Sequence, residues 1–300
     1  MKIQYTESLI EKGLLVTKEV CLPRGLQGFM LKYHNKVFYN NLWEDHPILK
    51  ECRGSVVDSQ GNAIILPFKK IYNLGENGTA VAPETYVEAI RKVNGFMAAV
   101  TQVNGSWVVS TTGSTTSAHV EMAKEKLGML SADRFPMSGN FTYIFEICHE
   151  DDPHIVEEEY GAYLIGIRNV LTGSLCSESV CDSIAAMGGW MRPSRSELQF
   201  GKLLKLSKRC KHEGFIVRDR STGEPLCKLK SPHYLSKKFI MRLGKTKAEG
   251  MFEDPEKVKQ IVDEEFYSVV DAIVKEHSLE EWKALTGQER RDYIEDFFEG

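Results

Sequence analysis

The sequence has no long hydrophobic run and no paired cysteine motif, and these two absences exclude several classes of protein. No stretch approaches the roughly 18 consecutive apolar residues of a membrane-spanning helix, so we expect no membrane partner. The polar start Met1-Lys2-Ile3-Gln4 does not resemble a signal peptide. The seven cysteines are odd in number and contain no C-x-x-C, which favours reduced thiols in a cytosol over disulfides or a zinc site.

Charge is distributed unevenly along the chain, although the net charge is only −4. Residues 201–247 hold fourteen Lys or Arg against three acids, a balance of +11. Residues 248–300 hold sixteen acids against six bases, a balance of −10. A concentrated basic segment favours a phosphate-bearing partner, whatever the total charge.

The hydrophobic pattern predicts an α+β fold in which antiparallel sheets are flanked by helices. Asn104-Gly105 between two alternating apolar runs is a strong β-hairpin signal. The expected strands cover residues 28–33, 37–39, 51–58, 63–68, 96–100, 107–110, 141–148, 162–168, 214–217 and 226–230. The expected helices before the tail cover residues 83–91, 118–127, 174–188 and 232–244, the last of them ended by Gly244.

The last part of the chain changes character, from strands to helices and from basic to acidic. Asp254-Pro255 is expected to open a helix with one apolar face, and Ser278 and Thr286 each begin a capping box. We therefore predict two domains, a sheet-rich domain over residues 1–245 and a small all-helical C-terminal domain over residues 246–300.

Lys92 is the first candidate for covalent chemistry, because it precedes Gly95 and the predicted hairpin. The Lys-x-x-Gly pattern is weak evidence, since it recurs at Lys211 and Lys247. Gly244-Lys245-Thr246 suggests a phosphate-binding loop, but that motif requires a glycine where Phe239 stands. His149 and His154 lie among acids and could hold a metal, although a polar loop is the simpler interpretation.

Several charged residues follow Lys92 at the ends of predicted strands. Lys228 and Lys230 alternate along one strand and so share a face, where two like charges require an anion between them. A triphosphate is a natural anion for that position. Glu146 and Glu213 supply the carboxylates that a Mg²⁺ ion prefers.

Over residues 29–235 the order of these motifs resembles that of the covalent nucleotidyltransferases, and most closely the phage-type RNA ligase 1 family of ATP-dependent RNA ligases. The matching segments are Cys52-Arg53-Gly54, Pro67 to Glu76, Lys92-Val93-Asn94-Gly95, Tyr143-Ile144-Phe145-Glu146, Glu213 to Val217, and Lys228-Leu229-Lys230-Ser231. Three positions depart from the family pattern. The family usually has an acid at Asn94, a serine or threonine at Phe96, and often a lysine at Thr112.

The resemblance implies a nucleotidyltransferase fold and an enzyme that joins the 5′-phosphate and 3′-hydroxyl ends of RNA. It implies Lys92 as the nucleophile that carries AMP, with ATP and Mg²⁺ as cofactors and Glu146 and Glu213 at the metal. The ATP-binding residues it implies are Arg53, Lys70, Gly95, Glu146, Glu213, Lys228 and Lys230. It also suggests RNA repair, tRNA included, by a monomer in a phage- or bacterium-like cytosol.

The first step requires an unprotonated lysine, whose ordinary pKa is roughly 10.4. We expect Lys228, Lys230 and Mg²⁺ to disfavour the ammonium form of Lys92. Two alternatives stay open: a GTP- or DNA-specific covalent nucleotidyltransferase, and a non-catalytic RNA-binding module that keeps the fold. The acidic helical tail argues against the β-barrel domain that the first alternative usually carries.

Overall fold

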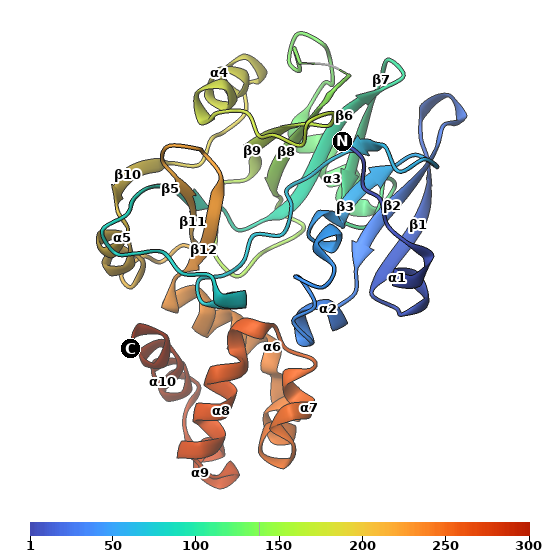
Figure 1. Cartoon of the computed structure of the whole chain (residues 1–300). Helices are drawn as coiled ribbons and strands as arrows, with labels where there is room; N and C mark the ends of the chain where they lie inside the picture. The colour runs from blue at the N-terminus through green and yellow to red at the C-terminus, as the bar shows by residue number, and fades with distance from the viewer. Residues whose placement is uncertain (138) are drawn as a thin grey trace.

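The computed structural model has an α+β architecture, as the sequence predicts, with sheets above and a group of helices at the C-terminal end (Figure 1). It describes residues 1–137 and 139–300, with the side chains of residues 242 and 244–247 outside that description. The strands form three four-stranded antiparallel sheets.

Each sheet has its own strand order. The first sheet is β1 (Leu15–Cys21), β2 (Gln27–Tyr33), β3 (Arg53–Val57) and β4 (Ala63–Ile65). The second is β10 (Arg195–Gln199), β5 (Tyr86–Lys92), β11 (Gly214–Asp219) and β12 (Pro225–Lys230). The third is β7 (Ser106–Thr111), β6 (Phe96–Val103), β8 (Phe141–Cys148) and β9 (Gly161–Asn169).

The helices lie between and beyond these strands. They are α1 (Glu7–Glu11), α2 (Lys36–Tyr39), α3 (Ala118–Leu127), α4 (Glu178–Gly188), α5 (Phe200–Ser207), α6 (Pro232–Glu253), α7 (Pro255–Lys259), α8 (Tyr267–Glu276), α9 (Leu279–Ala284) and α10 (Gly287–Glu299). Four short 3-10 turns cover Pro23–Gly25, Pro47–Glu51, Glu76–Gly78 and Glu264–Phe266. None of the helices described is long and apolar enough to cross a membrane.

The predicted hairpin is confirmed as β6 and β7 of the third sheet, which the chain enters directly from β5 of the second sheet. Asn104 and Gly105 both have positive φ, as a tight hairpin turn requires. Before this hairpin, the register aligns Lys92 with Gly214 and Gly214 with Lys230 across three neighbouring strands of the second sheet. These pairings bring residues that are far apart in the sequence to one end of that sheet.

Two of the predicted elements are wrong, and a third has the wrong end. Residues 83–91 were expected to form a helix, but residues 86–92 form β5, because pairing with both β10 and β11 buries Val87 and Ala89. Residues 37–39 were expected to form a strand and instead belong to the short helix α2. Gly244 does not end its helix, since α6 continues to Glu253.

The C-terminal helices share one hydrophobic core. Phe239 and Leu243 of α6 pack with Phe266, Val270 and Ile273. Both predicted capping boxes are present, at Ser278 and Thr286. Because α6 passes without a break through residue 245, the two domains that we predict are joined by a continuous helix.

Candidate active site

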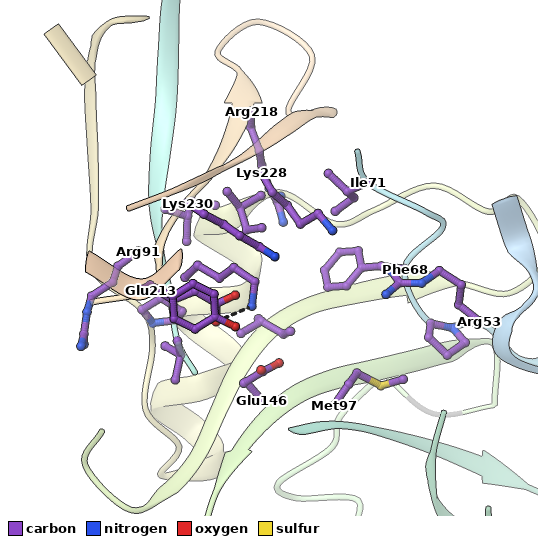
Figure 2. Close-up of a pocket in the computed structure, with 18 of the residues that line it drawn as sticks. Arg53, Phe68, Ile71, Arg91, Met97, Glu146, Glu213, Arg218, Lys228 and Lys230 are labelled. Atoms are coloured by element: carbon purple, nitrogen blue, oxygen red, sulfur yellow. Dashed lines mark hydrogen bonds and ion pairs between the residues drawn. The ribbon is translucent and has the colours of Figure 1, made fainter. Parts of the chain in front are cut away.

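A cavity of about 310 Å³ lies where the second and third sheets meet. Figure 2 shows Glu213, Lys228 and Lys230 on one side of it and Arg53 on the other. The predicted site residues that line it are Arg53, Lys92, Glu146, Glu213, Lys228 and Lys230. Two predicted residues do not line it: Gly95, whose backbone amide donates a hydrogen bond to Glu146, and Lys70. Six side chains from five segments of the sequence therefore meet at one cavity.

Lys92 ends β5 and reaches into this cavity with 21% of its side chain exposed. Its Nζ lies 2.9 Å from Oε2 of Glu213. Burial lowers the pKa of the Lys92 ammonium, but the Glu213 and Glu146 carboxylates outweigh it and leave the pKa raised. The expected activation by lysine neighbours is therefore not found in the chain alone, because the nearest charges are carboxylates.

Gly95 brings the second and third sheets into close contact beside Lys92. A Cβ at this position would lie 2.2 Å from the carbonyl oxygen of Ile147, so a side chain does not fit. The Gly95 amide instead donates a hydrogen bond of 3.1 Å to Oε1 of Glu146. The glycine of the Lys-x-x-Gly motif thus positions Glu146, which explains its place in the predicted site.

Asn94 positions the second carboxylate of the site, that of Glu213. Its side chain is buried, and its Nδ2 donates to Oε2 of Glu213 at 2.9 Å. Its Oδ1 accepts a hydrogen bond of 3.0 Å from the backbone of Val156. The sequence marked Asn94 only as a departure from the family pattern. The structure shows that the amide supplies a donor to Glu213 that an ionised acid could not supply.

Lys228 and Lys230 line the same cavity, as their shared strand face predicts. Burial, together with Lys230, Lys70 and Arg53, lowers the pKa of Lys228 well below its usual range. Among the described residues, Lys228 has no carboxylate within ion-pair distance. Lys230 differs, since its ammonium pairs with Glu265 of the helical tail. Lys228 is therefore a buried cationic site that an anion would stabilise.

Lys70 lies in a neighbouring ion-pair cluster. Its side chain is 4% exposed and pairs with Glu76 and, at 3.2 Å, with Glu264. Burial lowers the pKa of Lys70, but Glu264 and Glu76 raise it above its ordinary value. Among the residues described, the Lys70 ammonium therefore forms ion pairs with one carboxylate of its own loop and one of the tail.

The cavity also contains residues that the sequence did not single out. Arg218 of β11 lines it and forms a 2.6 Å ion pair with the buried Glu178. A charged residue inside an apolar strand was the signal that could have identified Arg218. Lys238 lines it from α6, and nothing in the helical pattern distinguishes this lysine from its neighbours.

The residues present fit a Mg²⁺ ion at Glu146 and Glu213. Both carboxylates face one cavity, and oxygen ligands suit this metal. Burial raises the pKa of Glu146, and Glu213 adds to that effect against the attraction of Lys92. A cation held by these residues would stabilise the charged form of Glu146.

The alternative sites from the sequence are less complete. Glu125, His149 and Glu150 gather closely enough to hold a metal, with ligand atoms within 4.8 Å of one another. The Lys126 ammonium already pairs with both of these carboxylates. Gly244-Lys245-Thr246 is helical within α6, and its side chains lie outside the described residues.

Comparison with known proteins gives one family for this chain. The sequence model of a family described as RNA ligase, of the T4 RNA ligase 1 type, matches residues 51–240. A protein of the Autographa californica nuclear polyhedrosis virus, described as a candidate bifunctional polynucleotide kinase/RNA ligase, is 22% identical over 254 residues. That match covers 73% of this chain and 34% of the viral protein, so the chain spans about a third of that relative's length.

Two solved structures show the same fold. An archaeal ATP-dependent RNA ligase aligns with a TM-score of 0.61 at 15% identity, over 97% of this chain and 74% of that one. An Aquifex aeolicus protein described as a candidate ATP-dependent DNA ligase aligns with a TM-score of 0.54 at 12% identity, over 96% and 75%. The family match covers more than half of the sequence and includes the whole cavity around Lys92. The chain belongs to the RNA ligase family.

Proposed function

We propose that this protein is an ATP-dependent RNA ligase that joins a 5′-phosphate to a 3′-hydroxyl end through a lysyl-adenylate and an RNA-adenylate. The observation that carries the proposal is the shared cavity, in which Lys92 meets Glu146, Glu213, Lys228 and Lys230. A nucleophile, carboxylates for a metal and cations for phosphate are the groups that nucleotidyl transfer needs.

In the first step, the unprotonated Nζ of Lys92 attacks the α-phosphorus of ATP. A phosphorus–nitrogen bond forms, the bond to the bridging oxygen of the β-phosphate breaks, and pyrophosphate leaves. Before this attack the Lys92 ammonium loses its proton to solvent, because the Glu213 carboxylate at 2.9 Å favours the charged form and raises the pKa of Lys92. Lys228 and Lys230 stabilise negative charge on the phosphates, where catalysis depends on positioning and electrostatics.

In the second step, the 5′-phosphate of RNA attacks the adenylate phosphorus, and Lys92 leaves as the amine. In the third step, a 3′-hydroxyl attacks the activated 5′-phosphorus, the phosphodiester forms and AMP leaves. A Mg²⁺ ion held by Glu146 and Glu213 would neutralise charge on the reacting phosphoryl oxygens. We further propose that the chain works as a monomer, in the ATP-containing cytosol, on broken RNA such as cleaved tRNA.

Incubation with α-labelled ATP or GTP tests this proposal and its alternatives. An RNA ligase gives a protein–AMP adduct with ATP and then seals 5′-phosphorylated RNA. A labelled protein with GTP alone would indicate a guanylyl-specific relative, and sealing of DNA ends in preference to RNA would indicate a DNA-specific one. A folded protein that binds RNA but takes no label from either nucleotide would be a non-catalytic module, and the proposal would be wrong.

A further inference from the structure

Three lysines from separate parts of the sequence are held by one short acidic segment of the tail, residues 263–265 between α7 and α8. Lys70 pairs with Glu264 at 3.2 Å. Lys238 of α6 pairs with Asp263 and with Glu265, each at 2.6 Å. Lys230 of β12 pairs with the other oxygen of Glu265. One carboxylate thus bridges two lysines, and its neighbour in the sequence holds the third.

These ion pairs are shielded from solvent, so each buried charge needs an opposite charge close to it. The side chains of Lys70, Lys230, Lys238 and Glu265 are each 10% exposed or less. Burial raises the pKa of Glu265, but Lys230 and Lys238 lower it to about 2. Removing one partner of a buried ion pair leaves an uncompensated charge, so this cluster requires an anion at all times.

The ion pair with Glu265 does not fully offset the cost of burying the positive charge of Lys230. Burial lowers the pKa of Lys230, and the nearby Lys238 lowers it further, so that the pKa stays below its ordinary value despite the Glu265 and Glu213 carboxylates. An anion with more negative charge than one carboxylate would stabilise the ammonium form better. Phosphate groups offer that charge together with several acceptor oxygens.

The cluster adjoins the cavity that holds the nucleophile. Lys230 and Lys238 line the 310 Å³ cavity with Lys92, and Lys228 and Lys230 also line a second cavity of about 530 Å³. Glu264 and Glu265 line the second cavity. Lys230 stands two strands from Lys92, roughly 10 Å at ordinary strand spacing. An ATP molecule with its α-phosphate at Lys92 can extend its other phosphates toward these lysines.

We propose that Glu264 and Glu265 of the tail occupy, in the unliganded chain, the subsite beside Lys70, Lys230 and Lys238 that the β- and γ-phosphates of the nucleotide take when it binds, so that these two carboxylates must be displaced. The inference rests on the proposed function for the identity of the nucleotide. It assigns Lys238 a phosphate-binding role. Binding of ATP or pyrophosphate is then a competition with two carboxylates of the tail.

Calorimetric titration of the full chain with inorganic pyrophosphate and Mg²⁺ tests the subsite without requiring catalysis. The variant Glu264→Gln/Glu265→Gln keeps the shape of both side chains and removes their charge. We expect it to bind pyrophosphate roughly tenfold tighter, because no charge-assisted hydrogen bond to a carboxylate has to be broken. The matched control Glu280→Gln/Glu299→Gln changes two exposed acids of the same tail and leaves the affinity unchanged.

Two milder variants keep the test decisive if the double variant does not fold. Glu264→Gln alone should show a larger rise of Tm on addition of pyrophosphate than the unmodified chain, since at one ligand concentration a tighter ligand stabilises the folded state more. Lys238→Gln should weaken pyrophosphate binding roughly tenfold. Unchanged affinity and unchanged Tm shifts in these variants would overturn the subsite.

The two proposals fail separately. If ATP labels the protein but the variants do not change pyrophosphate affinity, the ligase proposal stands and Asp263 to Glu265 have a structural role only. If the affinities change as expected but no lysyl-adenylate forms, the subsite stands and the proposed function fails.

Discussion

The Nδ2 amide of Asn94 and the Nζ of Lys92 lie at the same distance, 2.9 Å, from a single oxygen atom of Glu213. Oε2 of Glu213 therefore accepts from a neutral donor and a charged donor together. Burial raises the pKa of Glu213, but Lys92 and Lys230 lower it below its usual range, and the Asn94 hydrogen bond contributes in the same direction. The side chain at position 94 thus acts on Lys92 through the Glu213 carboxylate that both contact.

Replacing Asn94 with Asp should reduce stability in a pH-dependent way. The variant places a second carboxyl group against Glu213, so one of the two must keep a proton to a higher pH. A carboxyl whose pKa is raised by folding binds more protons in the folded chain, and stability falls as pH rises. We expect the free energy of unfolding to fall by about 1–3 kcal/mol at neutral pH. Urea unfolding should show a smaller loss near pH 4, about the ordinary pKa of Asp.

Lys92→Ala should abolish the covalent adduct with labelled ATP, because no other described lysine has the same place between Glu146 and Glu213. Lys211→Ala is the matched control, since Lys211 begins an equivalent Lys-x-x-Gly motif but is 74% exposed and pairs only at 3.7 Å with Glu295. Peptide mapping of the labelled protein checks the assignment. AMP on a lysine other than Lys92 would show that the assignment is wrong.

The rate of adenylylation should rise with pH. Since the pKa of Lys92 is raised by Glu213 and Glu146 against the effect of burial, the amine form becomes more abundant as pH rises toward that pKa. Glu213→Gln removes the strongest raising influence and should move the pH–rate curve to lower pH. Single-turnover rates measured across pH test this by the position of the curve, whatever its height. A curve that keeps its position would separate Glu213 from the ionisation of Lys92.

Lys228→Ala should weaken nucleotide binding more than any substitution of an exposed lysine in the same basic segment. The buried Lys228 ammonium lacks a carboxylate partner among the described residues, so a bound phosphate is its natural counterion. We expect the KM for ATP in the first step to rise roughly tenfold or more. The exposed Lys205→Ala is the control. Equal KM values for the two variants would place Lys228 outside the nucleotide site.

The buried ion pair between Glu51 and Arg168 should contribute strongly to stability. Its two hydrogen bonds measure 2.7 and 2.9 Å, and Arg168 also donates to the carbonyl oxygen of Pro67. Glu51→Gln leaves a buried charge without its partner and should cost about 3 kcal/mol. Lys50→Gln, which removes the exposed pair with Glu44, should cost no more than about 1 kcal/mol. Denaturant unfolding of both variants compares the two pairs directly.

The sequence predicted those parts of the fold that depend on local signals. The Asn104-Gly105 hairpin and the Ser278 and Thr286 caps require only neighbouring residues, and all three are present. Strand β5 was missed because its place between β10 and β11 depends on partners more than 100 residues later in the chain. Gly244 was read as a helix end, but core packing on both sides of it, by Leu243 and Met251, continues the helix.

The sequence motifs predicted which residues form the site, but not which side chains contact one another there. Motif order identified Lys92, Glu146 and Glu213. Their meeting in one cavity follows from the pairing of β5 with β11 in one sheet and of β6 with β8 in the next. The opposite charges of the tail and of the basic segment suggested contact between them. A charge count cannot say which acid reaches which lysine, so the pairing of Glu265 with Lys230 and Lys238 required the structure.

The continuous course of α6 has a consequence for the design of chimeras. Lys238 lies in the first third of this helix, and Phe239 and Leu243 directly after it belong to the core of the C-terminal helices. A chimera joined to a relative at residue 245 would cut the helix within that core and separate Lys238 from the acids that hold it. A junction after Ser231 would exchange Lys238 and residues 263–265 as one unit. The relative that supplies the C-terminal helices would then also supply the residue at position 238, one of the three lysines proposed to meet the phosphates.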